Sequence, residues 1–116
     1  MFMILLVLDD PNYVDEVLDA WYKLGVSGAT IIDSSGFYRR MAERPHMRFL
    51  YGSMEFSSKG NMTVIAVVPD LAFIDSCLRA VEEIIGDLDN PNTGIFTSWP
   101  LTICKGVTSK FKKADI

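Results

Sequence analysis

The chain has 116 residues, of which 49% are hydrophobic and 22% charged, and its formal net charge is −4 at pH 7. This length and composition predict one compact domain over residues 1–116 and exclude a disordered chain. No apolar run approaches the ~18–20 residues that span a bilayer, and no basic segment precedes Met1–Leu8. We therefore expect a cytoplasmic protein without direct membrane insertion. The mean hydropathy of +0.21 is high for so small a chain, so we expect an oligomer interface to hide the excess.

The first predicted element is a strand at Phe2–Leu8, a continuous apolar run typical of a strand buried on both faces. Asp10-Pro11 then predicts a helix start, and Gly25 predicts its end. One face of this helix is apolar at steps of three and four, formed by Val14, Val17, Leu18, Trp21 and Leu24.

A second strand is expected at Ala29–Ile32, which is rich in β-branched residues and flanked by glycines. Residues 37–60 show neither a helical nor a strand period, so they are predicted to form a long loop. Loops of this length in a small domain are usually functional. The third strand is predicted at Met62–Val68.

Asp70 predicts the cap of a second amphipathic helix, which Gly86 ends. A turn-rich loop follows at 87–94, and Ile95–Cys104 is predicted as the fourth strand. Its Pro100 should place that strand at an edge or a bend. Residues 107–116 form a polar tail.

The predicted order is therefore β-α-β-β-α-β, with a long loop between the second and third strands. This order is typical of an α+β, ferredoxin-like fold with a four-stranded antiparallel sheet. Since both helices lie on one side of such a sheet, we expect the other side to be buried against further subunits.

The cations are concentrated in two segments of an otherwise acidic chain. Arg39, Arg40, Arg44 and Arg48 lie in one ten-residue stretch, and four lysines lie in the last twelve residues. Focused basic segments favour binding of a small anion, whereas nucleic-acid binding needs a broad positive face. We therefore expect an anionic small molecule as a ligand and no nucleic-acid partner.

Three short stretches carry a resemblance to a known family. Gly25-Val26-Ser27-Gly28-Ala29-Thr30 is similar to a G-[VI]-x-G-x-T segment that enters the second strand of that family. Gly36-Phe37-Tyr38-Arg39-Arg40 resembles the G-F-G-R-Q that opens its long T-loop, and Gly94-Ile95-Phe96 resembles the end of its B-loop. With the order of the elements, these stretches resemble the nitrogen regulatory PII signalling proteins, over roughly residues 1–104. The chain is identified as a divergent, PII-like member.

The resemblance implies a non-catalytic signalling protein, a homotrimer with a ligand-binding cleft between each pair of subunits. An adenine nucleotide such as ATP or ADP would bind there, although no cofactor is certain from the sequence. The implied ligand-binding residues are Thr30, Gly36, Phe37, Arg39, Arg40, Gly86, Asp87, Asn92, Thr93, Gly94 and Lys105. The loop at 37–60 would contact a transporter, enzyme or regulator, and its expected partner-binding residues are Met47, Phe49, Tyr51 and Met54.

Two alternatives remain open at this point. One is a protein-interaction module without a ligand, and the other is a metal-binding trimer of the same topology that resembles the copper-tolerance proteins. Asp87 and Asp89 are a small ligand set for a metal, and their loop lacks the downstream glutamate of a calcium loop. Catalysis is not expected, because the single histidine, His46, has no nucleophile in a local motif. Cys77 and Cys104 lie in apolar runs and are expected to be buried thiols.

Overall fold

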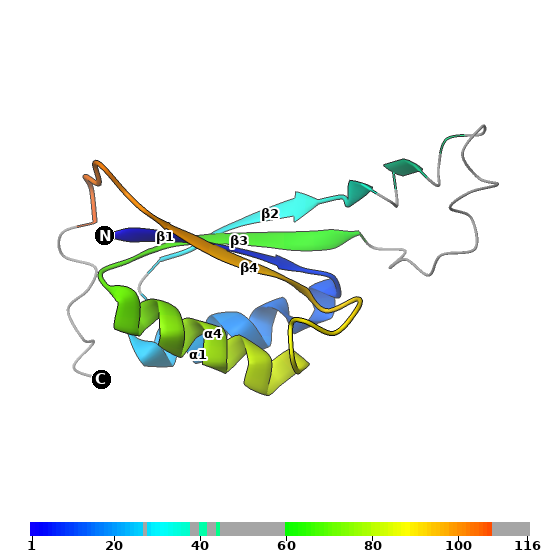
Figure 1. Ribbon diagram of the computed structural model, residues 1–116, viewed down its shortest axis with the longest axis horizontal. Helices are drawn as coiled ribbons and strands as arrows, with labels where there is room; N and C mark the ends of the chain where they lie inside the picture. Colours follow the sequence, from blue (N-terminus) through cyan, green and yellow to red (C-terminus); the bar gives the residue numbers. More distant parts are fainter. Residues whose placement is uncertain (27, 38–39, 42–43, 45–59, 108–116) are drawn as a thin grey trace.

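The computed structural model describes residues 1–26, 28–37, 40–41, 44 and 60–107. It is an α+β structure in which a four-stranded antiparallel sheet carries two α-helices on one face (Figure 1). No helix of the described residues covers the other face, which we call the open face. The elements are β1 (Phe2–Leu8), the 3-10 turn η1 (Pro11–Tyr13), α1 (Val14–Leu24), β2 (Thr30–Ser34), β3 (Asn61–Val68), α4 (Leu71–Ile85) and β4 (Gly94–Pro100).

The strand order in the sheet is β2-β3-β1-β4. Each neighbouring pair is antiparallel, so β1 and β3 are central and β2 and β4 are the two edges. The antiparallel sheet and the two helices agree with the prediction, and the arrangement is compatible with a ferredoxin-like fold.

The core lies between the helices and one face of the sheet. Alternate residues of the two central strands are fully buried there, because side chains in a strand point to opposite faces in turn. These strand residues pack against Val17 and Trp21 of α1 and Val81 of α4. The buried strand residues are Ile4, Leu6, Leu8, Val64, Ala66 and Val68.

One polar contact ties the two helices together inside this core. The indole Nε1 of Trp21 donates a hydrogen bond of 3.2 Å to the carbonyl oxygen of Cys77. Cys77 is fully buried, as predicted, and burial raises the pKa of its thiol from 9.0 to about 12. Cys104 is only half-buried, so its predicted burial is wrong: it lies beyond the end of β4, where no helix packs over it.

The predicted helix boundaries agree with the backbone geometry. Asp10 accepts a hydrogen bond from the amide of Asn12 and caps η1, which precedes α1. Asp70 accepts one from the amide of Phe73 and caps α4. Gly25 ends α1 with φ of 106°, a left-handed conformation that glycine adopts without strain.

Three predicted strands have different boundaries in the structure, and the third begins at Asn61 rather than Met62. The second strand is Thr30–Ser34 rather than Ala29–Ile32, because it continues as far as it can pair with β3. The fourth strand ends at Pro100 instead of Cys104. It pairs with β1 as far as Phe2, and one further backbone hydrogen bond of 3.0 Å joins the Leu101 amide to the Met1 carbonyl. The position of Pro100 in an edge strand agrees with the prediction.

Candidate functional site

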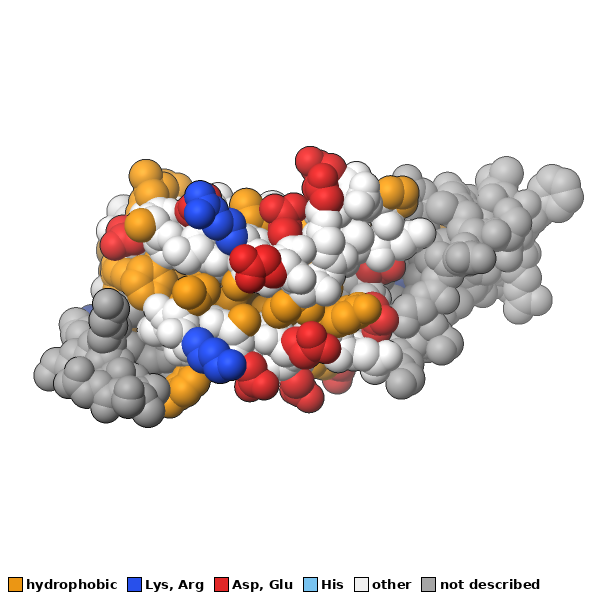
Figure 2. Space-filling view, turned by 90° about the horizontal axis from the view of Figure 1, so that it is seen from below, with side chains coloured by type: hydrophobic (Ala, Val, Ile, Leu, Met, Phe, Trp, Pro, Cys, Tyr) orange, Lys and Arg blue, Asp and Glu red, His pale blue; other side chains and the backbone are white. Residues whose placement is uncertain are grey.

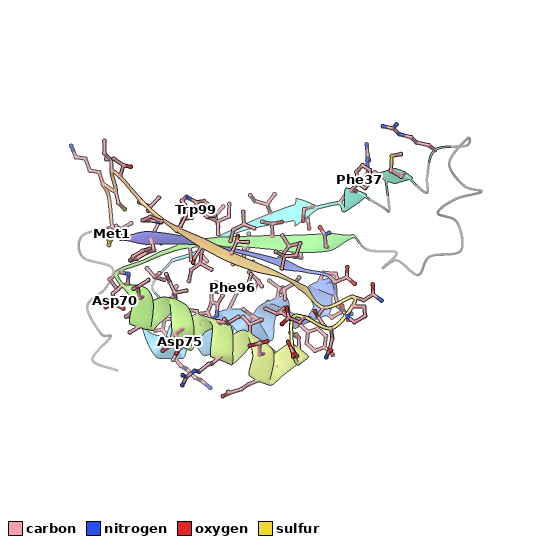
Figure 3. All side chains as sticks on the ribbon, in the orientation of Figure 1. Met1, Phe37, Asp70, Asp75, Phe96 and Trp99 are labelled. Atoms are coloured by element: carbon pink, nitrogen blue, oxygen red, sulfur yellow. The ribbon has the colours of Figure 1, made fainter. Side chains whose placement is uncertain are left out.

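The open face of the sheet is apolar and carries no charged residue at its strand positions. Cross-strand pairing places alternate residues of all four strands on this face. Ile32, Ile95 and Trp99 are 44%, 59% and 42% exposed, although all three are large and hydrophobic. Figure 3 shows Trp99 on this side of β4 and Phe96 on the helix side. The open-face residues are Met3, Leu5, Val7, Thr30, Ile32, Ser34, Asn61, Thr63, Ile65, Val67, Ile95, Thr97 and Trp99.

The outer surface of the helix layer has the opposite character. Acidic side chains border an apolar band between α1 and α4 (Figure 2), and only two basic side chains lie among them. Both helices are amphipathic and direct their charged residues outward, as expected of a face in water. The open face differs from the helix face in having no charged side chain at any of its strand positions.

A small polar cluster interrupts the open face at the end where β2 and β3 separate. The hydroxyl of Ser34 donates a hydrogen bond to Oδ1 of Asn61. It also lies 2.9 Å from the hydroxyl of Thr63. The sequence analysis did not single out this cluster, although the alternation of polar and apolar residues in β3 was a signal for it.

The residues after β2 extend the chain past the end of the sheet. Gly36 is followed by a helical turn, in which the amide of Arg40 donates to the carbonyl of Gly36 over 3.1 Å. Phe37 is 66% exposed, and the side chains of Arg40 and Arg44 are also exposed. Tyr38, Arg39, residues 42–43 and 45–59, and with them the predicted partner-binding residues Met47, Phe49, Tyr51 and Met54, lie outside the described residues.

The loop from 86 to 94 folds into a turn that uses its own amides. The amide of Leu88 donates to Glu82 Oε2, that of Asp89 to Asp87 Oδ1 and that of Asn90 to the Asp87 carbonyl, over 2.9–3.0 Å. The Thr93 hydroxyl closes the turn by donating to two backbone carbonyls. These three amides are therefore not available to a phosphate.

The same loop is acidic and has no cation of its own. Glu82, Asp87 and Asp89 lie on or beside it, and the sequence contains no lysine or arginine between Arg79 and Lys105. An anion at this loop would therefore need a cation from another part of the chain or from another molecule.

Two of the predicted ligand-binding glycines have different structural roles. A Cβ at Gly94 would lie 2.2 Å from the carbonyl oxygen of Val7, so the close approach of the first residue of β4 to β1 requires glycine there. A Cβ at Gly36 would meet only the Asn61 amide nitrogen at 3.4 Å, an ordinary contact. The fold therefore does not demand glycine at position 36, whereas it does at position 94.

One chain does not bring the predicted ligand-binding residues together. Gly94 pairs with Leu8, Leu8 with Met62, and Met62 with Asp33, so Gly94 and the end of β2 face each other across the whole sheet. Three strand spacings of ~4.8 Å put these two edges about 14 Å apart.

Two further predicted residues lie away from that end of the sheet. Thr30 is at the start of β2, four residues before Ser34, and its exposed side chain belongs to the open face. Lys105 follows β4, which leaves the sheet at the end opposite the 86–94 loop (Figure 1). A single site that uses all these residues would need more than one copy of the chain.

Within the described residues, no group of three or more His, Cys, Asp or Glu side chains is placed to hold a metal ion. The helices of this same part of the chain are all too short or too polar to cross a membrane. Comparison with known protein families and with curated proteins gives no match to this chain.

Proposed function

We propose that the protein is a non-catalytic sensor that assembles through the open face and binds an anionic small molecule between copies. A homotrimer and an adenine nucleotide such as ATP or ADP are the assembly and the ligand that the PII-like stretches favour. The signal would pass to a target transporter, enzyme or regulator through residues 37–60.

The observation that carries this proposal is the charge-free, apolar open face. Burying side chains such as Leu5, Ile95 and Trp99 gains roughly 25 cal/mol per Å² of apolar surface removed from water. We infer that a second copy covers this face, since a second copy is always present at the same concentration.

The distribution of the ligand-binding residues supports a site between copies. The arginines after β2 can supply the charge for a phosphate, since a guanidinium binds it with two parallel hydrogen bonds. The carboxylates of the 86–94 loop suit the hydroxyl and amino groups of a nucleotide, which donate hydrogen bonds. These two kinds of group lie at opposite edges of one sheet, about 14 Å apart, and a neighbouring copy would bring them closer together.

Sedimentation velocity tests the assembly. The wild-type chain is expected to sediment as an oligomer at micromolar concentration, and Leu5→Glu is expected to sediment as a single chain because it buries a carboxylate in the interface. Tyr22→Glu is the matched control, since Tyr22 is a large exposed residue on the helix side. A wild-type chain that stays single would overturn the proposal.

Calorimetry tests the ligand. Titration with ATP, ADP, AMP and cyclic dinucleotides is expected to give saturable heat with at least one of them, weakened in Arg40→Ala. No heat with any at millimolar concentration would remove the nucleotide from the proposal.

The hydrogen bonds inside the 86–94 loop favour a second candidate, an interaction module that binds no ligand. In that case the oligomer forms, no ligand gives heat, and a partner captured by the wild type is captured equally by Arg40→Ala. Capture that depends on a nucleotide would exclude this candidate.

A further inference from the structure

A groove lies on the outer side of edge strand β4, where the strand meets α4. It has a volume of about 330 Å³ and is lined by Leu78 and Glu82 of α4, Leu88 and Asp89 of the loop, and Gly94–Phe96 of β4. The hydrogen bond from the Leu88 amide to Glu82 fixes the loop against the helix and thereby shapes the groove.

The lining combines apolar walls with carboxylates. Leu78, Leu88 and Phe96 supply hydrocarbon surface, while Glu82 and Asp89 supply negative charge. An arginine or lysine side chain matches this combination, since its methylene stem packs on apolar surface and its charged end pairs with carboxylates. The sequence has no lysine or arginine between residues 80 and 104, so a cation that pairs with these carboxylates comes from another segment or another chain.

The topology of the sheet indicates where such a cation comes from. The edges β2 and β4 are antiparallel to each other, because each neighbouring pair in the order β2-β3-β1-β4 is antiparallel. The C-terminal end of β2 and the N-terminal end of β4 therefore lie at the same end of the sheet. A second copy that continues the sheet would set its β2 antiparallel to β4, as in any further strand of this sheet.

In that arrangement the segment after β2 of the second copy lies beside the groove. Arg40 and Arg44, both exposed, are the described cations of this segment. The groove has two carboxylates, and the segment has two guanidinium groups. The charges are complementary, and the contact is head-to-tail, the kind that closes a ring when the rotation between copies allows it.

We propose that the groove between α4, the 86–94 loop and β4 receives Arg44 of a second copy, which leaves Arg40 to the ligand of the proposed function. Each copy then offers its acidic groove to one neighbour and its Arg44 to the other. This inference rests on the assembly in the proposed function and assigns to it a second, charged contact in addition to the open face.

A charge exchange tests the contact. Asp89→Arg is expected to raise the dissociation constant of the assembly about tenfold or more, because it sets arginine against arginine. Arg44→Asp is expected to weaken the assembly similarly, and the two substitutions together should restore the constant to within about threefold of the wild type. Sedimentation velocity in low and high salt measures all four proteins, and circular dichroism verifies that each is folded.

Asp19→Arg is the matched control, since Asp19 is exposed on α1 and does not line the groove. It should leave the dissociation constant unchanged. Single variants that do not weaken the assembly, or a combination that does not restore it, would overturn the inference.

The two proposals fail in different ways. If Leu5→Glu dissociates the oligomer while Asp89→Arg does not weaken it, the groove contact is wrong and the open-face assembly stands. If the wild type is a single chain, both are wrong. If Asp89→Arg abolishes calorimetric binding of free arginine without weakening the assembly, the groove takes a small cation and the second copy is overturned as its occupant.

Discussion

The two faces of the sheet are built from similar residues but differ in what covers them. Leu6 is fully buried beneath the helices, whereas its neighbour Leu5 points to the open face and is only half-buried. The helix face is completed within the chain by Val17, Trp21 and Val81. The open face is also rich in hydrophobic residues, although polar ones lie among them, and no described segment covers it. Hydrophobicity alone therefore does not show which face one chain can bury.

The largest expected effect separates these two faces directly. Leu6→Ala should lower the free energy of unfolding by about 2–5 kcal/mol, because it leaves a cavity in a packed core. Leu5→Ala should cost about 1 kcal/mol in dilute protein, since its side chain is already partly in water. Urea denaturation at low protein concentration measures both. Equal losses would contradict the distinction between a covered and an uncovered face.

The next effect concerns the close approach of the first residue of β4 to its neighbour β1 at the edge of the sheet. Gly94→Ala should destabilise the protein by about 2–4 kcal/mol, because its Cβ would collide with the Val7 carbonyl. Gly36→Ala is the control and should change stability by less than about 1 kcal/mol. Thermal melts measure the stability of both variants. A Gly94→Ala variant as stable as the wild type would contradict the close approach of Gly94 to the Val7 carbonyl.

Particular elements show which parts of the structure could be predicted from the sequence and which could not. The apolar run of β1 and the three-and-four spacing of α1 predicted both elements, because each buries a continuous surface. The end of β4 was not predictable, since it depends on where β1 stops pairing. The resemblance implied ligand-binding residues in the 86–94 loop, but the use of its amides by Glu82 and Asp87 depends on geometry that a single sequence does not contain.

A third prediction concerns pH and the covered face. The pKa of the Cys77 thiol is raised from 9.0 to about 12 by burial, so folding favours its protonated form. Stability from this group is complete below pH 9 and is lost as the pH rises toward 12, because only the unfolded chain releases the proton easily. The loss approaches about 1.4 kcal/mol per pH unit within that window.

Cys77→Ala provides the control for this pH dependence. The variant is less stable at neutral pH because it loses packing in the core, but its stability should fall less steeply between pH 9 and 11. Urea denaturation over this range compares the two slopes. Parallel slopes for the two proteins would mean that the thiol titrates normally and that the covered face admits water at α4.

The smallest effect concerns the N-terminal cap of α4, one of the two helices that cover the sheet. Asp70→Ala removes the hydrogen bond of 2.9 Å from the Phe73 amide and should cost about 0.5–2 kcal/mol. Asp75→Ala, on the same helix, removes only an exposed ion pair with Arg79 and should cost less than about 0.5 kcal/mol (Figure 3). Urea denaturation gives both values. If the two losses were equal, the start of α4 would not depend on its cap, and the cover of the sheet would rest on side-chain packing alone.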